Sequence, residues 1–565
     1  MIHARARSLA ALVLGVTVGC QLGCKKDGAD PVTGGLPPEL RPHPAHVNVG
    51  KLTVPEWFAS IPTDTPYVVA AFEAVPVAFY ARFKDALAPM LGPALGQLRT
   101  GAGDAPVLAA VLDELDGKWN QAGFEALGFS AQPRYAVYGL GIQPVVARLE
   151  IKDDRAVQAT IVRIAGRAGT TLPEPVARGD RRYWRIAASD DTAALIALGD
   201  HQLIAALGKA ADVDAQLDLI LGVARPASNM ADGKQLKELM TRHGFGPQAV
   251  AFADTHKLAS AALQAAGAKP TPLCPSELDQ LATSVPRVAL GAGEFTPHDL
   301  AWGMVVELAP DVAAAARSLQ VEIPGLADAL SGRPMFAFGG DIDLAAGQEL
   351  ARVAAERLKH LGEACGLPAL EQGADQAIQT LSGALPDFAG LLTGGAVALR
   401  NIDFGAADPR AGAPRKLDAE AVLASPDARV LFARILALDP QLRQFSFSTD
   451  GKLHDLRGSQ VPLPIPIAAG VGEKTIVITT GDQRAARGDR LLAARGGKAP
   501  LLAFTYDYGG LVGLIHKFGG AALETAPAVR ETYDVLGKLL GRAVMTLDVT
   551  DHSVALWSSL EVNDR

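Results

Sequence analysis

Paired carboxylates are the residues of this chain whose types and spacing best suit chemistry. They are Asp153-Asp154, Asp190-Asp191 and Asp341-Ile342-Asp343. Neighbouring carboxylates can bind calcium through their oxygens or work together as an acid and a base. The same residues are favoured at helix N-caps and hairpin tips, where their oxygens accept hydrogen bonds from backbone N–H groups. Each pair falls at such a boundary, so we interpret all three as structural.

Metal-binding patterns are missing from the sequence. The eleven histidines occur singly and share no local spacing, and no HExxH, CxxC or Cys/His pair with metal-ligand spacing occurs. We therefore predict no metal site and no cofactor. A basic helix is expected over residues 235–243, with Lys234, Lys237 and Arg242, and it is most simply a solvated face and not an anion site.

Phosphate-binding and nucleophile motifs are also missing. Gly509-Gly510 lies near Lys517 without the GK[ST] ending that positions a lysine and a magnesium ligand in phosphate loops. Gly139-Leu140-Gly141 begins like a dinucleotide fingerprint, but Pro144 interrupts it before a helix N-terminus could receive a phosphate. No GxSxG elbow, SxxK or kinase motif set occurs. These absences favour a protein that is not an enzyme.

The beginning of the chain has the pattern of a secretory signal. Arg5 and Arg7 precede an apolar run over residues 9–18. That run is shorter than the roughly 18 to 20 apolar residues that a membrane-spanning helix needs. A short basic region followed by a short apolar region is typical of an export signal.

The end of this segment, Val16-Thr17-Val18-Gly19-Cys20, resembles the lipobox of bacterial lipoproteins. The resemblance implies that residues 1–19 are a cleaved signal peptide and that Cys20 becomes a membrane anchor carrying acyl chains such as palmitate. Gln21 is not Asp, which in enterobacterial lipoproteins implies sorting to the outer membrane. Cys24 is a rival acceptor with less suitable preceding residues, and a conventional signal that leaves no acylated cysteine is the other alternative.

Residues 20–50 are rich in proline and glycine and cannot bury much apolar surface. We expect them to form an extended tether that holds the folded part away from the membrane.

Two cysteines remain beyond the tether, Cys274 and Cys365, and each follows an Ala-rich helical pattern. An exported protein meets an oxidising compartment, where two such cysteines often pair. We predict a Cys274–Cys365 disulfide, with two separate buried thiols as the alternative.

The stretch Val461-Pro462-Leu463-Pro464-Ile465-Pro466-Ile467 alternates proline with apolar residues. Proline removes backbone donors and forces an extended conformation. We interpret this stretch as cover for a sheet edge, with a docking strip for a partner as the alternative.

Short apolar strand patterns recur along the chain. Four copies are Thr65–Ala74, Pro247–Asp254, Pro334–Asp341 and Pro500–Asp507, and second patterns follow them from Arg134, Arg287, Ala396 and Arg542. A polar turn followed by an apolar strand occurs twice, at Gly199–Ile204 and Gly472–Val477. The repeats predict two similar halves, residues 51–330 and 331–565. Chance similarity in an Ala-rich chain is the alternative.

Periodicity predicts the secondary structure. Apolar residues at helical spacing predict amphipathic helices over 155–168, 311–319, 344–361 and 419–436. Continuous apolar runs predict strands at 67–72 and 249–252. Hairpins outnumber strand-helix-strand crossovers, so we expect an α+β fold of antiparallel or mixed sheets with helices packed on one face.

Composition limits the partners. The chain is 49% hydrophobic and only 5% aromatic, with a net charge of −8, and loss of Arg5 and Arg7 with the signal would lower this charge to about −10. No long basic run occurs, and few aromatic residues are available for base stacking. We therefore exclude nucleic acid as the main partner.

The chain as a whole resembles envelope lipoproteins of the Ala-, Gly- and Arg-rich kind found in high-GC Gram-negative bacteria. Its segment Ile61–Val68 resembles the P-A-D-T-P-Y opening of secreted proteins of unknown function. We expect a lipid-anchored lipoprotein of the outer membrane, on its periplasmic or surface face, with a non-catalytic binding or structural role. An envelope protein or a cell-wall component would be its partner. The alternatives are a carrier of lipid or another apolar ligand in a groove between sheet and helices, and an enzyme whose site is assembled from distant residues.

Overall fold

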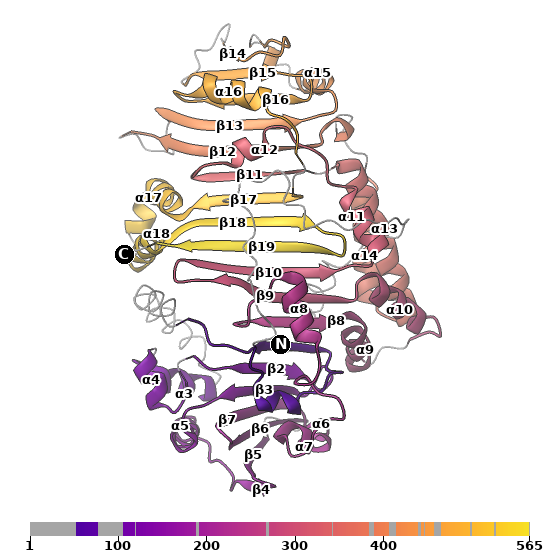
Figure 1. Cartoon of the computed structure of the whole chain (residues 1–565), viewed down its shortest axis with the longest axis vertical. Coiled ribbons are helices and arrows are strands. Elements are labelled where there is room, and N and C mark those ends of the chain that lie inside the picture. The colour runs from indigo at the N-terminus through magenta and orange to yellow at the C-terminus, as the bar shows by residue number, and fades with distance from the viewer. Residues whose placement is uncertain are drawn as a thin grey trace. The chain divides into compact units, whose positions relative to one another are not determined.

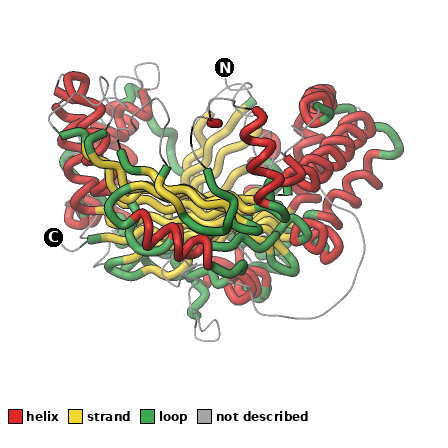
Figure 2. Tube along the Cα trace, turned by 90° about the horizontal axis from the view of Figure 1, so that it is seen from above, coloured by secondary structure: helices red, strands yellow, loops and turns green. Residues whose placement is uncertain are grey.

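The computed structural model describes residues 52–563, with gaps at 77–105, 119, 131, 188–190, 267–269, 342, 384–388, 406–413, 439–441, 444, 446, 457–464, 498–499 and 525–526. The signal segment, Cys20, Cys24 and nearly all of the tether lie outside these residues, as does most of the stretch 461–467. Helices and antiparallel strands together give the expected α+β class (Figure 1). Some helices stand beside the ends of the strands and others lie against the strands (Figure 2).

The chain divides into two compact units, each discontinuous in sequence. The first unit comprises Pro44–Gly267 and Arg287–Gly303, and the second comprises Ala268–Pro286 and Met304–Arg565. Residues 268–286 and 304–330, which the division expected from the repeats assigned to the first half, therefore group with the second unit.

In the first unit, antiparallel strands alternate with helices along the chain. Its elements are η3 (Glu56–Ser60), β1 (Tyr67–Ala71), α3 (Pro106–Leu115), α4 (Gln121–Ala126), β2 (Tyr135–Gly139), β3 (Val145–Glu150), α5 (Asp154–Arg167), β4 (Val176–Arg178), β5 (Arg181–Ala187), β6 (Thr192–Gly199), β7 (Gln202–Lys209), α6 (Ala210–Ala215), α7 (Leu217–Leu221), α8 (Gln235–His243), β8 (Val250–Asp254), α9 (Thr255–Ala266) and β9 (Arg287–Phe295). β10 (Asp299–Glu307) begins in this unit and ends in the second.

The sheet of the first unit is antiparallel at every pairing, in the order β4-β5-β6-β7-β3-β2-β1-β8-β9. The turn between β6 and β7 places Asp200 and His201 at φ values of 51° and 55°. Two successive left-handed residues match the right-handed twist of a tight hairpin, which is why this polar turn joins two apolar strands. α5 packs on the sheet through Val157, which joins a buried cluster with Trp184 and Leu198.

The second unit contains longer helices. Its elements are α10 (Cys274–Ser284), α11 (Pro310–Arg317), α12 (Leu326–Leu330), β11 (Phe336–Asp341), α13 (Leu344–Cys365), α14 (Pro368–Leu381), η4 (Ala389–Leu391), β12 (Gly394–Asp403), β13 (Lys416–Ala424), α15 (Ala428–Leu438), β14 (His454–Asp455), β15 (Ile467–Val471), β16 (Thr475–Thr480), α16 (Arg484–Ala493), β17 (Leu502–Asp507), α17 (Tyr508–Glu524), α18 (Pro527–Leu539), β18 (Leu540–Val549) and β19 (Ser553–Val562).

The sheet of the second unit is also antiparallel, in the order β14-β15-β16-β13-β12-β11-β17-β18-β19. One face is covered by α12 and α16 and carries the main core (Figure 1). Small side chains on this face let α12 approach closely: a Cβ at Gly339 would lie 2.5 Å from Leu326 Cδ1. α15 packs on the opposite face at the β15–β16 corner, through Leu431 and Ile476. We refer to the face bearing α12 and α16 as the covered face and to the other as the open face.

The segment 419–436 corrects one sequence prediction. Its first part is strand β13, and helix α15 begins only at Ala428. Ala, Val and Leu at successive positions satisfy a helical period and a strand period equally well. Residues 416–424 form a strand because they pair with β12 on one side and with β16 on the other.

Candidate functional site

The two cysteines beyond the tether form a disulfide in the structure. Cys274 begins α10 and Cys365 ends α13, with an S–S distance of 2.05 Å and a Cα–Cα distance of 4.7 Å. Both side chains are buried. The pairing expected from the sequence therefore joins two helices of the second unit. Cys20, the expected lipidation site, lies outside the described residues.

Two of the paired carboxylates cap helices, as expected. Asp153 Oδ1 accepts hydrogen bonds from the backbone N–H groups of Arg155 and Ala156, at 2.9 and 3.1 Å. Asp343 accepts one from Ala346 N at 3.0 Å. These contacts satisfy the free N–H groups at the starts of α5 and α13. Asp190 lies outside the described residues.

Asp341 differs from the other carboxylates because it is completely buried at the end of β11. Its Oδ2 accepts a 2.6 Å hydrogen bond from Val321 N, while Oδ1 has no hydrogen-bond partner among the described residues. Burial raises the pKa of Asp341 to about 7; backbone hydrogen bonds oppose this shift, and the negative charge of Asp548 adds to it. A fully buried carboxyl cannot touch a substrate, so its role in this arrangement is structural.

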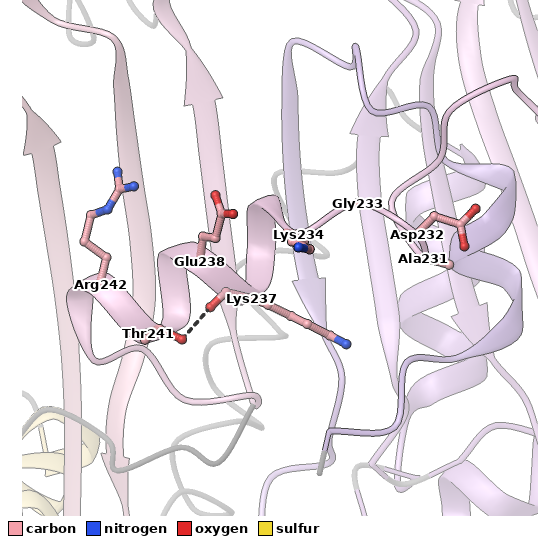
Figure 3. A pocket seen from close by; sticks show the side chains of 8 residues that line it. All are labelled: Ala231, Asp232, Gly233, Lys234, Lys237, Glu238, Thr241 and Arg242. Atoms are coloured by element: carbon pink, nitrogen blue, oxygen red, sulfur yellow. Dashed lines mark hydrogen bonds between the residues drawn. The ribbon is translucent and has the colours of Figure 1, made fainter. Parts of the chain in front are cut away.

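The basic helix expected over 235–243 is α8, and an open depression of about 580 Å³ lies beside it. The depression is lined by Ala231, Asp232, Gly233, Lys234, Lys237, Glu238, Thr241 and Arg242. Figure 3 shows Lys237 and Arg242 pointing in different directions, and the dashed line marks the 2.9 Å hydrogen bond from Thr241 Oγ1 to the Lys237 carbonyl. Because Lys237 and Arg242 point in different directions and Glu238 is also part of the lining, these side chains do not form a binding site for a single anion. The interpretation as a solvated face fits this geometry.

A row of apolar side chains crosses the open face of the second unit. Ile478 lies opposite Ala421, Ala421 opposite Val397, and Val397 opposite Phe338. Phe338 lies opposite Phe504, and Phe504 lies opposite Met545. These six residues, which we call the second-unit row, come from β16, β13, β12, β11, β17 and β18, and none of them is charged.

The second-unit row is open to solvent at its centre and at its Ile478 end. Phe338 is 46% exposed, Val397 48% and Ile478 39%, and the other members are partly buried. An antiparallel sheet with one covered face normally places polar residues on the other. Exposed apolar residues that are contiguous mark binding surfaces in soluble proteins. The row is therefore the best candidate for a functional surface in the part of the chain that the structure describes.

Aromatic rings extend the row along the strands. Phe336 contacts Phe504 with ring centroids 5.2 Å apart, Tyr506 lies 5.3 Å beyond, and Tyr508 lies 4.9 Å from Tyr506. The Tyr506 hydroxyl donates a 3.0 Å hydrogen bond to the Tyr508 hydroxyl. Burial, assisted by this bond, raises the pKa of Tyr506. The aromatic rings therefore end in two hydroxyls that are hydrogen-bonded to each other.

The sequence contains a signal for this surface that motif analysis did not use. Small residues alternate with large apolar ones in Phe336–Asp341 and in Leu502–Asp507. The small residues face α12 and α16, whereas Phe336, Phe338 and Phe504 face the other way. An alternation of small and large apolar residues thus marks a strand whose two faces are both apolar.

Within the described residues, no helix has the length and apolar character needed to cross a bilayer. The same residues contain no group of three or more His, Cys, Asp or Glu side chains placed to hold a metal ion. Comparisons of the chain with protein-family models, with curated proteins and with solved structures found no match.

Proposed function

We propose that this protein is a lipid-anchored envelope protein without catalytic activity, and that the second-unit row binds the acyl chain of a lipid. The observation that carries this proposal is the charge-free apolar row across six paired strands, with Phe338 and Val397 nearly half exposed.

The dimensions of the row favour an acyl chain. Adjacent strands lie about 4.8 Å apart, so six strands span roughly 24 Å. One leaflet of a bilayer, which an acyl chain crosses, is roughly 15 Å thick. An extended chain lying across the strands therefore fits within the row.

The expected anchor at Cys20 supports a lipid ligand. The tether of about 30 residues between Cys20 and residue 50 reaches up to about 100 Å when extended. A protein held this close to a membrane meets lipids continually. Metabolic labelling with palmitate tests the anchor: Cys20→Ala should remove the label and Cys24→Ala should retain it. The reverse result would make Cys24 the acceptor.

We also propose that the two units are equivalent products of an internal duplication. β1 lies between β2 and β8 in the first unit, and β11 lies between β12 and β17 in the second. Outward from these strands, β3 and β7 correspond to β13 and β16, and β9 corresponds to β18. The same order in both units supports the two halves expected from the sequence repeats.

A shared pair of residues supports this duplication. Asp254 ends β8 opposite Arg287 of the next strand, and Asp507 ends β17 opposite Arg542. Asp254 Oδ1 accepts a 3.0 Å bond from Lys257 N, and Asp507 Oδ2 accepts a 2.8 Å bond from Gly510 N, so each Asp caps the helix that follows its strand. Asp254→Ala and Asp507→Ala should each lower the unfolding free energy by about 1 kcal/mol. A loss at only one of the two positions would contradict the equivalence.

The binding proposal is tested by titrating the purified full-length chain, freed of co-purified lipid, with pyrene-labelled palmitate. Phe338→Glu places a charge at the centre of the row and should weaken binding at least tenfold. Val430→Glu is the matched control, because Val430 lies on α15, is 44% exposed and is not in the row. Equal affinities for the two variants, or no binding by the unmodified chain, would overturn the proposal. Sedimentation that shows a dimer dissociated by Phe338→Glu would instead assign the row to contact with a second copy.

A further inference from the structure

A short segment of the second unit, residues 318–325, connects α11 to α12, and we call it the strap. Its two ends are fixed by buried side chains. Ala316 in the last turn of α11 is 7% exposed, and Ile323 is 2% exposed within the core of the covered face. A Cβ at Gly394 of β12 would lie only 2.3 Å from Ile323 Cδ1, so this end of the strap packs closely on the sheet.

The middle of the strap is held by two carboxylates. Gln320 Nε2 donates a 2.6 Å hydrogen bond to Asp548 Oδ1 of β18, and Val321 N donates one of 2.6 Å to Asp341 Oδ2 of β11. Residues 318–322 include no buried side chain, since the first and the last are exposed and the three between them are half-buried. Lifting this part of the strap therefore breaks these two hydrogen bonds and exposes little further apolar surface.

The strap separates the carboxyl group of Asp341 from water. Asp341 is completely buried, whereas Val321, which contacts its Oδ2, is only half-buried. Asp341 Oδ1 has no hydrogen-bond partner among the described residues. Lifting the strap would therefore open a route for water to a carboxyl group that the closed arrangement satisfies on one oxygen only.

The charges around Asp341 do not favour its ionised form. Asp548 on β18 adds a negative charge. β12 places Gly394 opposite Asp341, and β17, which lies between β11 and β18, begins with Leu502. The other charged side chains nearby along the chain are Arg317, which pairs with Asp551, the exposed Glu322, and Asp343, which caps α13. Among the described residues, no cation pairs with Asp341.

We propose that the strap is a pH-dependent latch, which is closed while Asp341 carries a proton and lifts between Arg317 and Ile323 when Asp341 ionises. A buried carboxylate without a cation is unfavourable, and contact with water relieves it. Because Ile323 and α11 stay packed, the movement is local and leaves the core of the covered face intact. This device does not depend on the ligand proposed for the second-unit row.

The pH range follows from the pKa of Asp341 in the two arrangements. With the strap closed, burial raises this pKa to about 7; backbone hydrogen bonds oppose the shift, and Asp548 adds to it. In contact with water, Asp341 regains its usual pKa of 3.8. Between about pH 4 and 7, lifting releases a proton, so the ratio of lifted to closed strap should rise by about tenfold per pH unit. The latch is therefore closed in acid and loosens towards neutral pH.

Hydrogen–deuterium exchange of the purified full-length chain tests the latch. It is measured by mass spectrometry from pH 5 to pH 8 and corrected for the intrinsic pH dependence of exchange. Protection of peptides covering residues 318–322 should fall about fiftyfold from pH 5 to pH 7. Asp341→Asn should abolish this fall, because an amide cannot ionise and its oxygen still accepts the bond from Val321 N. Asp343→Asn is the matched control and should retain the fall.

Low concentrations of urea distinguish a local movement from unfolding of the whole unit. Exchange through a local opening hardly responds to urea, whereas exchange through unfolding accelerates with it. Strap peptides should therefore be insensitive to urea, and peptides from β16 should respond. Strap protection that does not change with pH, or that follows urea as β16 does, would overturn the latch.

A second variant keeps the inference testable if Asp341→Asn does not fold. Gln320→Ala removes one of the two hydrogen bonds that hold the strap but leaves Asp341 in place. It should lower strap protection by the same factor at every pH and leave the dependence on pH unchanged. Strap protection equal to that of the unmodified chain would show that these bonds do not hold the strap, and would also overturn the latch.

Discussion

The carboxylate of Glu420 on β13 lies 3.3 Å from Nε of Arg487 on α16, measured from Glu420 Oε2. Its other oxygen accepts a 3.1 Å hydrogen bond from Nε of Arg400 on β12. Glu420 is 2% exposed and Arg487 is 5% exposed, so two cations share one buried carboxylate on the covered face of the second unit. This group joins α16 to the sheet.

Glu420→Gln should destabilise the protein by about 3 kcal/mol, because it removes the buried charge that Arg400 and Arg487 share and leaves Arg487 only its ion pair with Asp418. Chemical denaturation monitored by circular dichroism measures the loss. Glu349→Gln is the matched control: Glu349 pairs with Arg352 at 2.6 Å, but the side chains are 60% and 34% exposed. An exposed pair contributes less than about 1 kcal/mol. Similar losses for the two variants would show that Glu420 does not stabilise the fold through charge.

Asp341 should make the second unit less stable as the pH rises from about 4 to 7. Its pKa is about 7 in the folded protein, against a usual value of 3.8, so the folded state retains a proton that the unfolded state has lost. Below about pH 4 both states are protonated and this stabilising contribution is fully present. It decreases as the pH rises and is lost above about pH 7.

Asp341→Asn tests this dependence, because an amide cannot ionise and its oxygen still accepts the hydrogen bond from Val321 N. We expect the melting temperature of the variant to exceed that of the unmodified protein at pH 8 and to match it near pH 4. The control Asp343→Asn should change the melting temperature little, because Asn caps helices as well as Asp does. A constant difference between Asp341→Asn and the unmodified protein at every pH would refute the assignment.

Arg148 should contribute strongly to the stability of the first unit. It is 1% exposed and donates hydrogen bonds to Tyr138 Oη at 3.1 Å, Gln202 Oε1 at 3.3 Å and the carbonyl of Ile220 at 2.8 Å. Lysine cannot reproduce this planar set of donors. Arg148→Lys should therefore cost about 3 kcal/mol of unfolding free energy. Arg155→Lys, at an exposed position of α5, should cost less than about 0.5 kcal/mol. If Arg148→Lys behaves like this control, the hydrogen bonds are not a source of stability.

The Cys274–Cys365 disulfide closes a loop with a sequence separation of 91 residues. A constraint of this length on the unfolded chain typically contributes about 2 to 5 kcal/mol. The double variant Cys274→Ala and Cys365→Ala should therefore melt well below the unmodified protein under oxidising conditions. A reductant should lower the melting temperature of the unmodified protein and leave the double variant unchanged. Equal melting temperatures without reductant would show that the disulfide contributes nothing.

Strands were predictable from sequence where an apolar run had clear ends. The pattern Pro247–Asp254 contains β8, and Pro334–Asp341 contains β11, because proline marks the entry and the run is too short for a helix. The segment 419–436 was not predictable in this way, since its small apolar residues fit either period. Its neighbours β12 and β16, distant in sequence, determine its conformation.

The candidate surface was only partly predictable. The sequence shows that Phe338 and Phe504 lie on strands, but not that α12 and α16 pack on the opposite face of those strands, which depends on tertiary structure. Asp341 looks like a capping residue in sequence, as its neighbour Asp343 is, and only the segment containing Val321 makes it buried. The lipobox, the tether and the location in the envelope remain predictions.

The chain passes between the two units at residues 267–268, 286–287 and 303–304. A single cut at any one of these positions therefore cannot yield both units as intact, separate fragments. During synthesis, the first unit lacks β9 until the ribosome has passed Phe295, and α10 has no disulfide partner until Cys365 has been made. Expression of either unit alone would therefore require a gene that joins segments of the chain that are separated in the natural sequence.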